Sequence, residues 1–168
     1  MSDTRTLLLN SRQIRQRIQR IAHQIVEVNF EEEEVIVVGI MDRGHILAER
    51  IATVLQEIAP FKVKLYSLEY DKQAPLESAY ACDLDAEAAR QKAVVLVDDV
   101  LNTGRTLIYA ANHLLQFSLK RLTTIVMVDR RHRSYPIRAD FVGLTLATTM
   151  QEHIAVELGN GEDAVYLE

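Results

Sequence analysis

Two short, uniformly apolar runs constrain the fold more than any other feature of the sequence. They cover residues 35–40 and 94–97. Each run is too short for a helix, and neither alternates with polar residues as a half-exposed strand would. Strands that are apolar on both faces lie inside a sheet that is covered on both sides. We therefore expect two buried strands of a parallel sheet.

Helical and strand-like patterns alternate around these two runs. Apolar residues recur at helical spacing over residues 14–26, 46–58 and 105–115, with Asn10 or Ser11 available to cap the first helix. Further strands are expected at residues 61–68, 123–128, 154–158 and 164–167. The stretch 71–91 lacks clear periodicity and suggests a functional loop or arm. This alternation predicts one α/β domain over residues 1–168, with a twisted, mainly parallel sheet flanked by helices.

Bulk composition excludes several classes of function. The formal net charge of −5 argues against charge-driven attachment to nucleic acid, although a local basic face could still bind RNA. No apolar stretch resembles a signal peptide or is long enough to span a membrane, so a cytoplasmic protein without membrane contact is expected. Cys82 is the only cysteine, which excludes an internal disulfide and a cysteine-based metal cluster.

The segment 94–106 carries the strongest functional signal. It reads V-V-L-V-D-D-V-L-N-T-G-R-T, so a buried strand leads into Asp98 and Asp99 and then into a short loop before a helix. Two neighbouring carboxylates can accept hydrogen bonds from the hydroxyls of a sugar. The loop amides, the helix amino terminus and the hydroxyls of Thr103 and Thr106 can bind a phosphate, and Gly104 permits close approach. The alternative is a solvated turn whose acids only cap the helix.

This segment resembles the phosphoribosyl pyrophosphate signature of the type I phosphoribosyltransferases. Residues 20–23, 38–40, 43–44, 128–133 and 136–143 are similar to one branch, the pyrimidine operon attenuators with uracil phosphoribosyltransferase activity. The resemblance implies the type I phosphoribosyltransferase fold with a small hood over the base. It also implies transfer of the 5-phosphoribosyl group from phosphoribosyl pyrophosphate to a pyrimidine, most simply uracil. Mg²⁺ would be bound through substrate oxygens without direct protein ligands, and the chain would form a homo-oligomer.

The resemblance also assigns roles to individual residues. Asp98 and Asp99 would hold the ribose hydroxyls, and Arg43 would face the leaving pyrophosphate, unless Arg43 forms a surface ion pair. Gly44 would begin a helix that points its positive end at the same group. Arg138 would be the main polar residue of a hood formed by residues 129–140, with an ion pair to Asp140 as the alternative. The residues around the 5-phosphate would be Asn102, Thr103, Gly104, Arg105 and Thr106.

The sequence departs from the pattern of this branch in three places. Met41 and Asp42 stand where a Lys-Thr pair is usual, which replaces a cation with an anion beside the leaving group. Tyr70 stands where an arginine of the flexible loop is usual, although Lys72 could take its place. Arg131 replaces a glycine of the hood. The departures leave a second hypothesis open, namely a nucleotide or phosphoribosyl pyrophosphate sensor without turnover.

Binding of regulatory RNA is a further hypothesis. The polar face of the first helix and the basic stretch 130–133 could form a basic surface for an RNA loop. Against it stand the overall negative charge and the acidic run 31–34, which we interpret as a solvated connection. The candidate RNA-binding residues are Arg15, Arg20, His23, His132 and Arg133.

Overall fold

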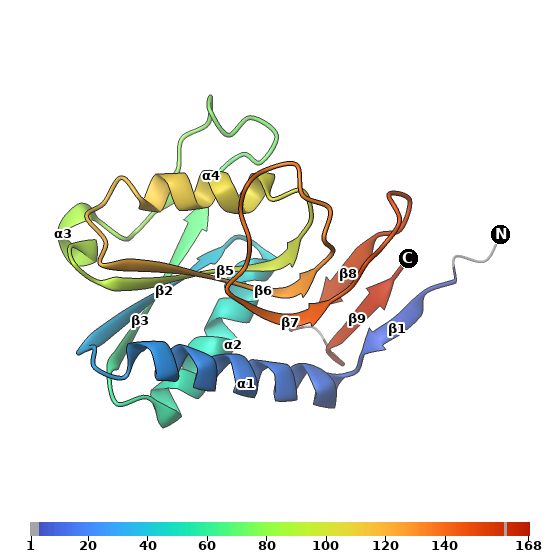
Figure 1. The fold of residues 1–168 in the computed structure, drawn as a ribbon, viewed down its shortest axis with the longest axis horizontal. Helices are drawn as coiled ribbons and strands as arrows, with labels where there is room; N and C mark the ends of the chain where they lie inside the picture. Colours follow the sequence, from blue (N-terminus) through green and yellow to red (C-terminus); the bar gives the residue numbers. More distant parts are fainter. Residues whose placement is uncertain (1–3, 160) are drawn as a thin grey trace.

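The computed structural model describes residues 4–159 and 161–168, and its centre is a six-stranded sheet (Figure 1). The strand order is β4-β3-β2-β5-β6-β7, in which all neighbours are parallel except the β3–β4 pair. The strands are β2 (Glu34–Ile40), β3 (Lys62–Glu69), β4 (Ala81–Cys82), β5 (Ala93–Leu101), β6 (Arg121–Asp129) and β7 (Phe141–Thr145). The two apolar runs lie in β2 and β5, next to each other at the centre, as predicted.

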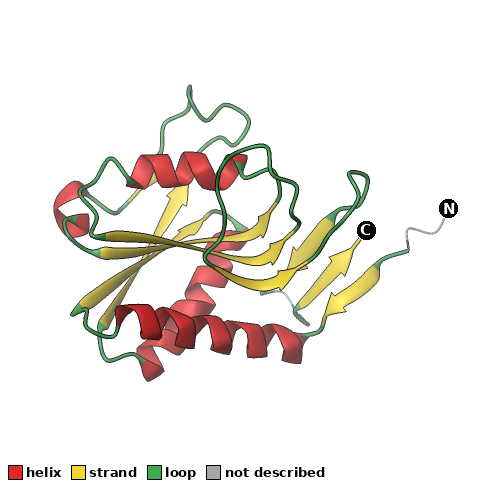
Figure 2. Cartoon of the chain, viewed as in Figure 1, coloured by secondary structure: helices red, strands yellow, loops and turns green. Residues whose placement is uncertain are grey.

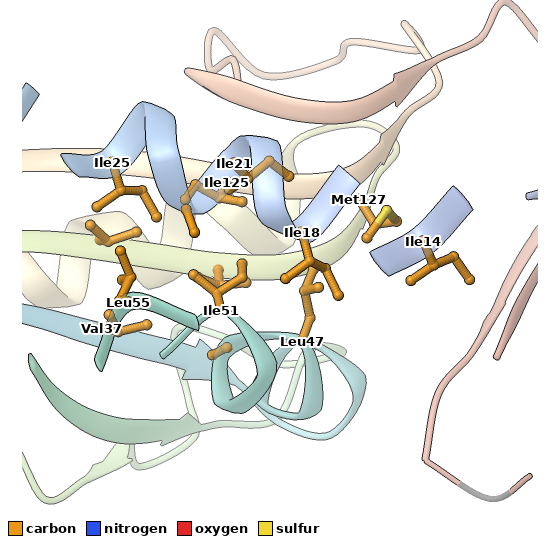
Figure 3. Close-up of a cluster of buried hydrophobic side chains, with 14 of the residues drawn as sticks. Ile14, Ile18, Ile21, Ile25, Val37, Leu47, Ile51, Leu55, Ile125 and Met127 are labelled. Carbon is orange, nitrogen blue, oxygen red and sulfur yellow. The ribbon is translucent and has the colours of Figure 1, made fainter. Parts of the chain in front are cut away.

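Helices cover both faces of this sheet (Figure 2). They are α1 (Ser11–Asn29), α2 (Arg43–Ile58), α3 (Ala86–Ala89) and α4 (Arg105–Leu114). The isoleucines of α1 meet the leucines and Ile51 of α2 in one buried cluster, which Figure 3 shows. Helix α4 and the short α3 close a second cluster on the opposite face. The predicted three-layer α/β architecture is confirmed, and Asn10 is the cap of α1, since its side chain accepts from Gln13 N at 2.9 Å.

A second, antiparallel sheet of three strands lies beside the first. Its order is β1-β9-β8, formed by β1 (Thr6–Leu9), β9 (Ala164–Leu167) and β8 (Ile154–Glu157). Arg50 of α2 ties this sheet to the main body through a bond from Nη2 to Asp163 Oδ1 of 2.9 Å. The strands at residues 154–158 and 164–167 were expected, whereas β1, β4 and β7 were not.

The acidic run 31–34 is more than a solvated connection, which corrects our expectation. The side chains of Glu32 and Glu34 are only 13% and 14% exposed. Glu32 pairs with Lys120 at 2.6 Å and with Arg121. Glu34 pairs with Lys64 of β3 and with Lys92, the residue that precedes β5. The run therefore joins the amino-terminal edges of several strands. No helix in the described ranges combines the length and apolar character that crossing a membrane requires.

Candidate active site

The β5–α4 turn, residues 102–106, lies at the carboxyl edge of the sheet. Gly104 has φ +90°, a conformation that other residues adopt only with strain, and α4 begins at the next residue. Thr103 Oγ1 accepts from Arg105 N at 3.3 Å. The N–H groups of Thr106 and Leu107 have no partner within the helix because they belong to its first turn. A small pocket here is lined by Asp98 and residues 100–107, so the structure places together the residues predicted around the phosphate.

The two carboxylates lie inside β5, which continues to Leu101, and not beyond its end as the sequence suggested. Asp98 is only 4% exposed, whereas Asp99 is half-buried. Burial raises the pKa of Asp98 well above its usual value, and the neighbouring charge of Asp99 raises it further, while Lys72 opposes the shift. Asp98 Oδ1 accepts from Asp99 N at 2.9 Å, and Asp99 Oδ1 accepts from Val100 N at 2.8 Å. Each carboxylate therefore keeps lone pairs for a further donor.

Helix α2 brings its first turn against this pair. A Cβ on Gly44 would lie 2.9 Å from Cα and Oδ1 of Asp98, so only glycine permits the approach. The Met41–Asp42 peptide bond that precedes the helix is cis. Arg43 lines a different pocket, with Ile46, residues 156–158 and Glu162. The predicted position of Gly44 thus agrees with the site, whereas the Arg43 side chain is placed beside the small sheet, and no ion pair of Arg43 occurs among the described residues.

The hood segment, residues 130–140, packs on the β5–α4 turn. The backbone N–H groups of Ser134 and Tyr135 donate to Thr103 O at 2.9 and 3.0 Å, and Ile137 fills the space beside Gly104. Arg138 is exposed, and its carbonyl accepts from Thr124 Oγ1. The carboxylate of Asp140 bonds to Thr124, and the described residues show no ion pair between Asp140 and Arg138.

The arm, residues 70–82, is attached to α4 through aromatic rings. The buried Tyr70 donates from its hydroxyl to Thr106 O at 2.6 Å. Its ring stacks on Tyr80 at 4.6 Å between centroids, and Tyr80 stacks on His113 at 4.8 Å. Burial raises the pKa of Tyr70, so the phenol stays protonated. Tyr70, which stands where the flexible loop of this branch usually has an arginine, is therefore packed against α4.

Two residues in contact with the site escaped the sequence prediction. Tyr70 was noted only as a departure, and Arg130 only as part of a basic stretch. Arg130 is 7% exposed and binds Asn102 Oδ1 at 2.9 Å. Its place directly after β6, an apolar strand, was the one available signal, because a charged residue there must find partners.

The candidate RNA-binding residues fall into two groups. Arg15, Arg20 and His23 are exposed on α1, and Arg20 also donates to the carbonyls of Val142 and Gly143 in β7. His132 and Arg133 belong to the hood, where His132 Nε2 bonds Thr148 O and Arg133 pairs with Asp129 at 2.7 Å. The second group thus joins the hood to the loop before β8 and to the end of β6.

The donor set fits a cation that is bound mainly by its substrate. No cluster of three or more His, Cys, Asp or Glu side chains with metal-binding geometry occurs in residues 4–159 and 161–168. Asp98 lines the small pocket at the tip of β5, and Asp99 is the next residue of the same strand. Mg²⁺ commonly takes one or two carboxylates and completes its shell with waters and substrate phosphates.

Comparisons with known proteins agree with this geometry. A family model described as phosphoribosyl transferase domain matches residues 5–158. The chain is 40% identical to the bifunctional protein PyrR of Roseiflexus sp. (strain RS-1), covering 95% of this chain and 93% of that protein, and 34% identical to PyrR of Clostridium novyi (strain NT), covering 96% of each.

The fold has a close match among solved structures. A hypoxanthine-guanine phosphoribosyltransferase from Bacillus anthracis superposes with a TM-score of 0.71 at 21% identity, covering 84% of this chain and 82% of that one. At this identity the likeness concerns the fold alone. With the family model, the PyrR relatives and the strand-tip site together, this chain belongs to the type I phosphoribosyltransferase family, in the branch that the PyrR proteins represent.

Proposed function

We propose that this protein transfers the 5-phosphoribosyl group from phosphoribosyl pyrophosphate to uracil. In this reaction the bond from the anomeric carbon to pyrophosphate breaks, a bond to N1 of uracil forms, and N1 loses its proton. The observation that carries the proposal is the junction at the tip of β5, where two carboxylates adjoin a turn whose first-turn amides are free to bind a phosphate. PyrR relatives, named as bifunctional, support the pyrimidine branch.

In this proposal, separate groups of residues bind the ribose and the 5-phosphate. Asp98 and Asp99 accept hydrogen bonds from the ribose hydroxyls, and the β5–α4 turn, with Arg105 at its edge, binds the 5-phosphate. Bound Mg²⁺ would neutralise the leaving pyrophosphate. Held in this way, the sugar presents its anomeric carbon to the base in a fixed geometry, which is the main source of rate in such a site. Arg138 is exposed in the hood and is available to the base. Arg43 is exposed but lines the pocket beside the small sheet, so its side chain would have to turn toward the leaving group when the substrate binds.

Steady-state assays test this proposal directly. Pyrophosphate release is measured with phosphoribosyl pyrophosphate, Mg²⁺ and, in turn, uracil, cytosine, hypoxanthine and guanine. Saturable release with uracil, and little with the purines, is expected. Equal rates without any base would refute transfer, and preference for a purine would refute the pyrimidine assignment. Nothing described in the fold favours the alternative of a sensor without turnover.

The carboxylate pair offers a second test. Asp98→Asn combined with Asp99→Asn should weaken UMP binding by about tenfold or more, because the ribose hydroxyls then donate to neutral amide oxygens in place of carboxylates. Isothermal titration calorimetry measures the affinity, and circular dichroism checks that the fold is kept. Unchanged affinity would show that the carboxylates do not hold the ribose.

Regulation through RNA is a second candidate function. It is favoured by the exposed basic side chains of Arg15, Arg20 and His23 on α1 and by the bifunctional relatives. Filter binding with pyrimidine leader RNA, at a stated salt concentration, is compared with unrelated RNA of equal length. Specific binding should fall in Arg15→Gln, and equal affinity for both RNAs would exclude this role.

A further inference from the structure

Arg130 is a buried guanidinium that bridges two segments of the site. Its side chain is held on one side by the β5–α4 turn and on the other by residues 148–152, the loop before β8. Nη1 donates to Asn102 Oδ1 at 2.9 Å, and Nε donates to Thr148 Oγ1 at 2.9 Å. Nη2 donates to Thr149 O at 3.1 Å and to Glu152 O. All four acceptors are neutral groups.

Arg130 therefore has no hydrogen-bonded carboxylate, although its charge contributes, after the bonds from Thr149, to lowering the pKa of the nearby Glu152. No carboxylate in the described part of the chain forms an ion pair with it. The carboxylate of Glu152 accepts instead from Thr149 N at 2.6 Å. A buried cation is normally neutralised by an anion, because removing it from water is costly. Asn102 separates this cation from the pocket at the tip of β5, so an anion bound there would supply the missing negative charge.

The same contact fixes which end of the Asn102 amide faces a ligand. A guanidinium has only N–H donors, so the atom of Asn102 that meets Arg130 must be the amide oxygen. The NH₂ end is then left for the pocket, which Asn102 lines. A phosphate oxygen accepts hydrogen bonds, so it needs a donor at this point. Without Arg130 the amide could rotate and present its oxygen, which would repel the phosphate.

We infer that Arg130 is a positioning residue for the 5-phosphate: it orients the Asn102 amide as a donor and adds behind it a positive charge that no ion pair neutralises. The inference deepens the proposed function and rests on it for the identity of the full substrate. Its physical content concerns the phosphoryl group alone. Ribose 5-phosphate is therefore the appropriate probe, because it carries the phosphate without a base or pyrophosphate.

The first test replaces the amide. Asn102→Asp gives Arg130 an ion-pair partner and removes the donor from the pocket. The melting temperature should rise, because the buried charge gains a counter-ion. Binding of ribose 5-phosphate, measured by calorimetry, should weaken by about tenfold or more, because a donor is lost and a negative charge is added. Lower stability together with unchanged affinity would overturn the inference.

The second test removes the charge. Arg130→Gln should weaken ribose 5-phosphate by about tenfold, and Arg130→Lys, which keeps the charge but not the fork, should lie in between. Arg131→Gln is the matched control, since it removes an exposed arginine from the same segment and should leave the affinity unchanged. A purely structural role would lower the melting temperature of Arg130→Gln and leave the affinity, measured well below that temperature, as in the wild type.

The two proposals can fail separately. Wild-type protein that binds ribose 5-phosphate in an Arg130-dependent way but releases no pyrophosphate with uracil would refute the proposed function and support the inference. If the wild-type enzyme is active, but Arg130→Gln and Asn102→Asp bind ribose 5-phosphate as tightly as the wild type, the proposed function is supported and the inference about Arg130 is refuted.

Discussion

At the scale of single residues, the buried position of Asp98 is expected to lower the stability of the unliganded protein. Its carboxylate lies where β5 is still buried, so the charged form is poorly solvated. In the complex, the hydroxyl donors of a ligand, or Mg²⁺ bound with it, would stabilise the charged form of Asp98. The unliganded protein has no such compensation, and this predicts opposite effects of one substitution on folding and on binding.

Asp98→Asn should stabilise the unliganded protein by about 1–2 kcal/mol at pH 7. The folded-state pKa of Asp98 lies above the unfolded value, so the carboxyl is stabilising only at low pH and the gain from Asn appears as the pH rises above about 4. Thermal denaturation between pH 3 and 7 measures it. Asp99→Asn removes the neighbouring charge that contributes to this shift, so it should stabilise in the same direction but by less than Asp98→Asn. A destabilised Asp98→Asn would contradict this account.

Tyr70 gives a second prediction at this scale. Tyr70→Phe removes the hydroxyl bond to Thr106 O and should cost about 1 kcal/mol at pH 7. Because the folded pKa is raised above the ordinary value of 10, the wild type should lose stability as the pH rises beyond 10, where the unfolded phenol ionises. The slope should be shallower in Tyr70→Phe. Tyr80→Phe is the comparison in urea titrations at pH 9 to 11: it keeps the bond to Thr106 O, and because burial raises the pKa of Tyr80 as well, its slope should also become shallower, but by less than in Tyr70→Phe.

At the scale of elements, the sequence predicts best those strands and helices whose own pattern is strong. β2 and β5 are apolar throughout, and the isoleucines of α1 repeat at helical spacing, so local pattern and tertiary position agree. The strands β1, β4 and β7 are short and become strands only through their partners, which a linear pattern does not reveal. Likewise, the β5–α4 turn was predicted from contiguous residues. The contacts of Arg130 and Tyr70 were not, because they join segments about 30 residues apart.

The junction of the hood and the β5–α4 turn depends on one glycine. In Gly104→Ala the new Cβ would lie 2.7 Å from Ile137 Cγ2 and would keep φ at +90°. We expect a loss of about 2–3 kcal/mol, of which roughly 1 kcal/mol is backbone strain. Gly161→Ala has φ +119° and open space around it, so it should show the strain alone. Urea denaturation compares the two variants. Equal losses in the free energy of unfolding would mean that contact with Ile137 of the hood does not contribute to the effect at Gly104.

At the scale of the whole molecule, one ion pair connects the two sheets through α2. Asp163 is buried, and the hydrogen bond from Arg50 lowers its pKa. Asp163→Asn should therefore cost about 1–2 kcal/mol at pH 7, and the difference from wild type should vanish as the pH falls below about 4. Melting curves from pH 3 to 7 test this. The exposed Glu162→Gln should follow the wild type throughout, and a pH-independent deficit in Asp163→Asn would exclude the ion pair as its cause.

The pairing of β1 with β9 has a consequence for biosynthesis. Thr6 lies opposite Leu167, so β1 receives its partner only after residues 164–167 have been translated. The main sheet needs nothing beyond β7 and can assemble earlier on the ribosome. Until residues 164–167 emerge, the leucines of β1 form an unpaired edge, the kind of segment that nascent-chain chaperones recognise.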